Sequence, residues 1–84
     1  MMTILWEKKA VRHMRKIPLP DRAVITGAVR SLSTWPECRN VKSLVNHEYE
    51  YRLRVGRYRV FFDIEDTLKI LKIEEVKKRD ESTY

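Results

Sequence analysis

Residues 49–62, YEYRLRVGRYRVFF, alternate apolar and charged side chains with a period of two, and Gly56 interrupts the alternation once. This pattern predicts a half-buried β-hairpin, because successive side chains of a strand point to opposite faces of a sheet. A connection with an even number of residues, the simplest being Val55-Gly56, keeps both strands in phase. A three-residue connection would pair arginines with core residues, which the side-chain period strongly disfavours.

The predicted pairing gathers the arginines of the hairpin on one face, with Arg54 opposite Arg57 and Arg52 opposite Arg59. The other face then carries the apolar pairs Leu53/Tyr58, Tyr51/Val60 and Tyr49/Phe62. Like charges directly opposite each other destabilise a sheet, so folding alone gives no reason to collect them. A docking polyanion does, because arginine suits bidentate phosphate contacts. The alternative is a solvated outer face that discourages edge aggregation.

The rest of the chain predicts the elements that complete this sheet. Two amphipathic segments are separated by Pro18 and Pro20 and are expected to form helices. The predicted order is strand, helix, helix, loop, hairpin, turn, strand and polar tail, over residues 3–6, 7–17, 21–35, 36–48, 49–62, 63–66, 67–76 and 77–84. This β-α-α-β-β-β order predicts an α+β fold, a small antiparallel sheet with a helical hairpin packed on the apolar face.

The length and composition predict one small domain over residues 1–84. Eighteen basic and twelve acidic residues give a formal net charge of +6, which favours an acidic partner. Cys38 is the only cysteine, so no internal disulfide can form. No stretch approaches the 18 or so apolar residues that a membrane span needs, and a soluble cytoplasmic protein is expected.

Catalysis by a bound metal or cofactor is not expected, because His13, His47 and Cys38 lie on different predicted elements without ligand-like spacing. The remaining candidate is the basic sheet face and the start of the tail. The residues expected to bind RNA by charge or stacking are Arg54, Arg57, Phe61, Lys77 and Lys78. RNA carries its own nucleophile, the 2′-hydroxyl, and arginines can stabilise the transition-state charge.

Arginines are poor general bases, because the guanidinium group stays protonated. Glu50 is the one carboxylate expected on this face, so it is a candidate base. The alternative is that Glu50 forms a salt bridge with Arg52.

Three stretches resemble a known family: Ile17-Pro-Leu-Pro20, Val41-Lys-Ser-Leu44 and Tyr51-Arg-Leu-Arg-Val-Gly-Arg-Tyr-Arg-Val-Phe-Phe62. In this order they resemble the RelE/ParE toxin superfamily of bacterial toxin–antitoxin systems, and its RelE-like branch in particular. The resemblance implies a RelE-like fold and the toxin of a type II system. It further implies a metal-independent endoribonuclease, an mRNA interferase that cleaves mRNA in the ribosomal A site by 2′-hydroxyl attack and so inhibits translation.

By resemblance, four residues carry the cleavage. Arg59 would stabilise the transition-state phosphate, and Arg52 would orient or help to activate the 2′-hydroxyl. Arg79 would protonate or electrostatically stabilise the leaving 5′-oxygen, and Tyr84 would stack on a nucleotide.

The sequence departs from the RelE pattern at two places. Glu50 stands where RelE has a basic residue, and Lys78 competes with Arg79 for the position after the last strand. A ParE-like DNA gyrase inhibitor of the same fold is one alternative function, and a non-catalytic RNA-binding module is the other.

The resemblance also implies partners, namely a cognate antitoxin, the 70S ribosome and mRNA, for a toxin that is monomeric when free. The cations expected to contact antitoxin or ribosomal RNA lie on the first helix: Lys8, Lys9, Arg12, Arg15 and Lys16. An acidic amphipathic segment of the antitoxin would complement them.

Overall fold

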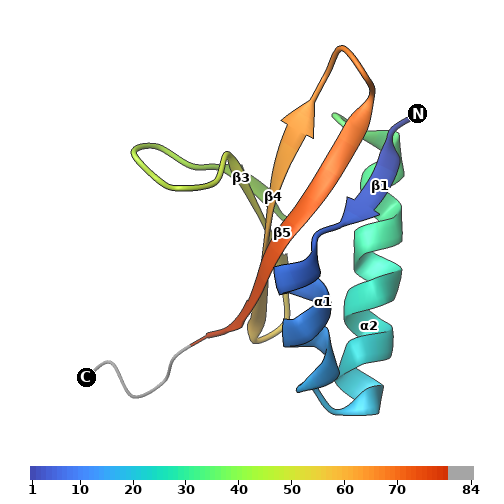
Figure 1. Cartoon of the computed structure of the whole chain (residues 1–84), viewed down its shortest axis with the longest axis vertical. Coiled ribbons are helices and arrows are strands. Elements are labelled where there is room, and N and C mark those ends of the chain that lie inside the picture. The colour runs from blue at the N-terminus through green and yellow to red at the C-terminus, as the bar shows by residue number, and fades with distance from the viewer. Residues whose placement is uncertain (80–84) are drawn as a thin grey trace.

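The computed structural model of the chain describes residues 1–79 and has an α+β fold, in which two helices lie on one side of a five-stranded sheet (Figure 1). The elements are β1 (Thr3–Trp6), α1 (Lys8–Arg15), α2 (Leu19–Arg30), the 3-10 helix η1 (Ser31–Thr34), β2 (Val41–Ser43), β3 (Tyr51–Val55), β4 (Tyr58–Glu65) and β5 (Ile70–Lys78). Within this range, no helix has the length and apolar character needed to cross a membrane. The predicted fold class is confirmed.

The strand order is β1-β5-β4-β3-β2, so the predicted antiparallel meander β3-β4-β5 forms the centre of the sheet. β1 pairs with β5 in parallel at one edge. At the other edge, β2 lies within the segment 36–48, for which only a loop was expected. β2 has three residues, too few to show a period, and it is fixed by pairing with β3 and by the Arg54 N–H, which donates to the Asn40 carbonyl at 2.9 Å.

The hairpin connection has an even number of residues, as predicted, but it is Gly56-Arg57 and not Val55-Gly56. Val55 pairs with Tyr58, so Arg54 lies opposite Arg59. The predicted arginine pairs are therefore wrong, because the turn lies one residue later in the chain than predicted. Gly56 has φ +57°, which suits the first central position of a two-residue hairpin turn. The displacement keeps Val55 in the strand, where it is buried.

The β4–β5 connection also differs from the prediction. β4 continues to Glu65, and the turn runs over residues 66–69, with the Lys69 N–H donating to the Asp66 carbonyl at 3.2 Å. β5 extends through Lys78, so the predicted polar tail begins as strand. An irregularity places Phe61 opposite Glu75 and Phe62 opposite Ile73, which leaves Glu74 without a register partner.

The core lies between the helices and the face of the sheet that the alternation predicts to be apolar. Its largest fully buried side chains are Ile25, Val29, Leu32, Val60, Phe62, Leu71 and Ile73. Tyr49 was expected in this core, and that expectation is wrong. β3 begins only at Tyr51, and the Tyr49 ring lies on the opposite face, 5.8 Å from Phe61.

Helix α1 also shields part of one sheet edge. Beyond the end of β1, the backbone N–H of Val76 in β5 donates to the Nδ1 atom of His13 at 3.2 Å. A buried strand edge needs such a partner for its backbone donors. This contact sets α1 beside the C-terminal half of β5.

Candidate nucleic-acid interface

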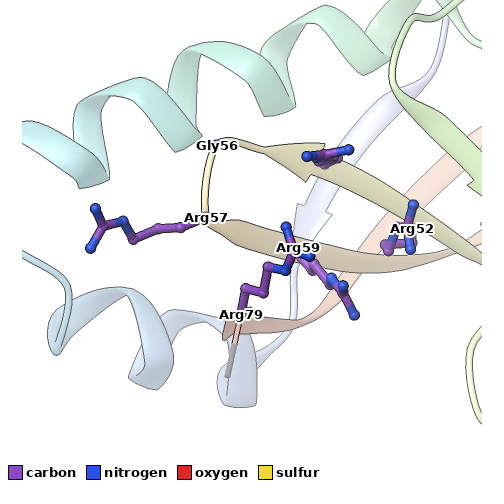
Figure 2. A pocket seen from close by; sticks show the side chains of 6 residues that line it. Arg52, Gly56, Arg57, Arg59 and Arg79 are labelled. Carbon is purple, nitrogen blue, oxygen red and sulfur yellow. The ribbon is translucent and has the colours of Figure 1, made fainter. Parts of the chain in front are cut away.

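Five arginines line one pocket on the face of the sheet that the helices leave open. The pocket has a volume of about 210 Å³, and its lining residues are Arg52, Arg54, Gly56, Arg57, Arg59 and Arg79. We call it the arginine pocket (Figure 2). Arg52 and Arg59 therefore face the same side from neighbouring strands, as the alternation predicts.

Two local features build the arginine pocket. Arg54 and Arg59 are direct cross-strand partners, so two guanidinium groups start from adjacent backbone positions. The Arg79 N–H donates to the Arg57 carbonyl at 2.6 Å, which fixes the end of β5 beside the hairpin turn. In Figure 2 the Arg57 side chain points away from Arg52, whereas Arg59 and Arg79 meet near the centre of the view.

The arginine pocket is not neutralised by carboxylates of the described residues. The ion pairs within residues 1–79 are Lys9–Glu75, Lys77–Glu75 and Lys69–Asp66, and none of them involves an arginine. The Nε atom of Arg52 is buried and has no hydrogen-bond partner in that range. The arrangement can bind an anion with several oxygens, since guanidinium groups match phosphate geometry.

The structure separates the two candidates for the tail position. Strand alternation turns Lys78 to the helix side, where it lines a different pocket together with His13 and Tyr58. Arg79 follows on the open side and lines the arginine pocket. Lys77 also lies on the open side, but its Nζ is 3.2 Å from Glu75 Oε2 and it does not line the pocket. Tyr84 lies outside the described residues.

Glu50 is not brought to the arginines. Its side chain accepts a hydrogen bond from the Ile64 N–H at 2.9 Å, and its own N–H donates to Asp63 at 2.8 Å. It lines a separate pocket with other carboxylates, and no salt bridge with Arg52 forms. Both expectations for Glu50, as the base and as the partner of Arg52, disagree with this geometry.

Phe61 lies on the open side, but it does not offer a free stacking surface. It is 7% exposed, because the ring of His47 stacks on it at 5.2 Å with an interplanar angle of 11°. His47 belongs to the β2–β3 loop, which projects from the sheet on the side away from the helices (Figure 1). The expected stacking of a base on Phe61 would require the loop to move.

Glu75 is a buried carboxylate on the open side that no sequence motif marks. It is 4% exposed and accepts contacts from Lys9 at 2.8 Å, Tyr49 at 3.0 Å and Lys77 at 3.2 Å. Burial acts to raise the pKa of Glu75, but the hydrogen bonds from Lys9, Lys77 and Tyr49 outweigh it and lower the pKa to about 2. Burial and the hydrogen bond to Glu75 raise the pKa of Tyr49.

The opposite end of the open face is acidic. Asp63, Glu48, Glu50 and Glu65 line one pocket there with Lys72. Burial, followed by a hydrogen bond with Asp63, raises the pKa of Glu74 to about 7. The open face therefore carries cations at its hairpin end and carboxylates at its far end.

The basic residues of the α1 region divide into two groups. Lys8, Arg12, Arg15 and Lys16 are exposed. Lys9 is instead committed to Glu75, and this hydrogen bond raises the pKa of Lys9. Within residues 1–79 the four exposed cations form no ion pair, and their contact with an acidic partner stays a prediction.

These features define a small α+β protein with a cationic sheet face. No family model matches the chain, and neither does any curated protein sequence. Solved structures do match it. The archaeal RelE–RelB complex of Pyrococcus horikoshii is similar at 23% identity and a TM-score of 0.80, over 96% of this chain and 98% of that chain.

Two further structures agree. The toxin–antitoxin complex RelBE2 of Mycobacterium tuberculosis is similar at 27% identity and a TM-score of 0.80, over 93% of this chain and 98% of that chain. The isolated Escherichia coli RelE toxin is similar at 15% identity and a TM-score of 0.82, over 99% and 89%. The chain is thus RelE-like in its fold, and the resemblance seen in the sequence is confirmed.

Proposed function

We propose that this chain is the toxin of a type II toxin–antitoxin system and a ribosome-dependent endoribonuclease that cleaves mRNA in the A site. The observation that carries the proposal is the arginine pocket, which gathers five guanidinium groups without a carboxylate partner among residues 1–79. The likeness to RelE toxins supports it. The protein would act in the cytoplasm, inhibit translation and need no metal.

In the proposed reaction, the 2′-hydroxyl of one nucleotide attacks the adjacent phosphodiester. Arg59, which lines the pocket, stabilises the charge that develops on the phosphate. Arg52 orients the 2′-hydroxyl from the neighbouring strand. Arg79 stabilises the leaving 5′-oxygen, and its place in the pocket favours it over Lys78 for this role. Arg54 and Arg57 hold the flanking phosphates, and Tyr84 stacks on a nucleotide.

A cognate antitoxin is the second part of the proposal. The similar structures from Pyrococcus horikoshii and Mycobacterium tuberculosis are complexes with an antitoxin. An acidic amphipathic segment would meet the exposed cations of the α1 region, which are Lys8, Arg12, Arg15 and Lys16. In the free, monomeric toxin the same cations would contact phosphates of the 70S ribosome.

The test is primer extension on a translated message, with and without ribosomes, for the wild-type protein and the Arg59→Ala variant. Arg59 is half-buried at the pocket and outside the core, so the variant should fold. Loss of such a contact removes about 2.7–4 kcal/mol of transition-state stabilisation, or roughly a 10²- to 10³-fold loss of cleavage. Arg30→Ala, an exposed arginine at the end of α2, is the matched control and should cleave like the wild type.

Three results would contradict the proposal. An Arg59→Ala protein as active as the wild type would remove the arginine pocket from the reaction. Intact mRNA together with inhibited supercoiling by DNA gyrase would instead establish the ParE-like activity. Binding to RNA without cleavage by the wild type would establish a non-catalytic RNA-binding module.

A further inference from the structure

One backbone donor of β5 is capped by a side chain instead of a neighbouring strand. The pairing of β1 with β5 ends at Ile73, whose carbonyl accepts the Glu7 N–H at 2.9 Å. Beyond Ile73, the N–H of Val76 donates to the Nδ1 atom of His13 in α1 at 3.2 Å. Val76 is 4% exposed, so its N–H depends on this acceptor to stay hydrogen-bonded. We call this hydrogen bond the His13–Val76 contact.

The His13–Val76 contact requires one protonation state of the imidazole. The hydrogen bond uses the lone pair of Nδ1, so the neutral ring carries its proton on Nε2. A second proton can enter only at Nδ1, where it would turn the acceptor into a donor that faces another donor. Protonation of the His13 ring and the His13–Val76 contact therefore exclude each other.

The surroundings of the ring make its protonation consequential. His13 is half-buried and lines a pocket of about 290 Å³ on the helix side, and histidine ordinarily changes its charge between pH 5 and pH 8. The other charged or titratable groups of the described chain that line this pocket are Lys16 of α1, Tyr58 of β4 and Lys78 of β5. The Tyr58 hydroxyl donates to Asp21 of α2 at 2.9 Å. An imidazolium would thus add a like charge beside Lys78, on the strand to which His13 is bonded.

A second contact between α1 and β5 keeps its charges over the same pH range. The Lys9 ammonium, one turn before His13 on α1, lies 2.8 Å from the carboxylate of Glu75, the neighbour of Val76 in β5. The pKa of Glu75 is lowered to about 2, and the hydrogen bond with Glu75 raises the pKa of Lys9. Both groups therefore stay charged where histidine titrates. Of the two contacts, the His13–Val76 contact is the one that responds to pH.

We propose that the His13–Val76 contact is a pH-sensitive link between α1 and the C-terminal half of β5, formed when the imidazole is neutral and broken when it is protonated. The stretch of β5 that it holds leads to Arg79, which follows Val76 by three residues and lines the arginine pocket. Protonation of His13 therefore weakens the support of the strand that ends at this pocket. The link is a property of the fold and does not depend on the proposed cleavage.

The test is amide hydrogen exchange of Val76 between pH 8 and pH 5, expressed as a protection factor so that the intrinsic pH dependence of exchange is removed. His13→Asn is the key variant, because the Asn side-chain oxygen is as many bonds from Cα as Nδ1 and accepts a hydrogen bond at every pH. His47→Gln is the matched control, since His47 is the chain's other histidine and stacks on Phe61 of the open side. Glu74, whose pKa is raised to about 7, titrates alike in all three proteins, so differences between them isolate His13.

We expect the Val76 protection factor of the wild type to fall about 3- to 10-fold more than that of His13→Asn as the pH drops from 8 to 5, as loss of one hydrogen bond predicts. His47→Gln should follow the wild type. A wild-type profile no steeper than that of His13→Asn would overturn the proposal, and so would a His47→Gln profile that matches His13→Asn.

The imidazole itself gives a second measurement that needs no variant. The NMR shifts of its nitrogens in the wild type should show a neutral His13 ring with the proton on Nε2 at pH 8, and the protection of Val76 should fall in step with the titration of that ring. A proton on Nδ1 at pH 8, or protection that does not follow the titration, would overturn the proposal even if His13→Asn fails to fold. Neither measurement uses RNA, so the link and the proposed function can each fail without the other.

Discussion

Replacing Glu75 by Gln removes the negative charge of a buried carboxylate on the open face that three side chains contact. The carboxylate is 4% exposed and contacts Lys9, Tyr49 and Lys77. Gln fills nearly the same volume and can still accept from Tyr49. It leaves both ammonium groups without their counterion, so the change tests the charge and leaves the packing almost intact.

The magnitude follows from the pKa of Glu75, which falls from the ordinary value of 4.5 to about 2. A shift of that size corresponds to about 3 kcal/mol of stability at neutral pH. The two lysine side chains are 46% and 65% exposed, and solvent weakens their share. We therefore expect Glu75→Gln to lower the free energy of unfolding at pH 7 by about 2 kcal/mol.

The direction of the pKa shift of Glu75 determines how its contribution to the free energy of unfolding depends on pH. Because the folded-state pKa is depressed, the stability from Glu75 is present above pH 4.5 and is lost as the pH falls toward 2. Urea unfolding at pH 7, pH 4 and pH 2 measures it, with the exposed Glu37→Gln as the control. A variant as stable as the wild type at pH 7, or a difference that persists undiminished at pH 2, would refute the reasoning.

Two further stability predictions use unfolding titrations. Gly27→Ala should stabilise the protein by about 0.5–1 kcal/mol, because Gly27 lies inside α2 and a Cβ there meets nothing within 4 Å; a destabilised variant would contradict this. Glu74→Gln should be as stable as the wild type below pH 4.5 and more stable by about 1 kcal/mol above pH 7. The reason is that the folded-state pKa of Glu74 is raised from 4.5 to about 7, so the wild type loses stability as the pH rises from 4.5 to 7. A constant difference from pH 4 to pH 8 would show that the raised pKa of Glu74 is not the cause.

The side-chain period predicts which face each hairpin residue occupies, but not which residues pair. Arg52 and Arg59 share a face under any even-length connection, so their place in one pocket follows from the sequence. The displacement to Gly56-Arg57 depends on the positive φ of Gly56 and on the burial of Val55, which are properties of the folded chain. The alternation of side chains alone therefore could not predict the register of the hairpin.

Other features depend on contacts between segments far apart in the chain. The position of the Tyr49 side chain is fixed by its hydrogen bond to Glu75, which lies 26 residues away in the sequence. Strand β2 forms because its residues pair with the edge of β3. No local signal marks either contact. Glu75 was missed for the same reason, since a glutamate in a strand carries no motif of its own.

The distribution of carboxylates explains why the arginine pocket is an argument for function. Arg54 and Arg59 are direct cross-strand partners, and this arrangement destabilises the sheet because both side chains are positively charged. Two carboxylates of the open face that could have relieved them are committed elsewhere: Glu75 to two lysines, and Glu50 to the backbone of Ile64. A fold selected for stability alone would place one of these carboxylates between the arginines. Leaving them unpaired is favourable if an anion from outside the chain supplies the compensating charge, as the phosphates of the proposed RNA substrate would.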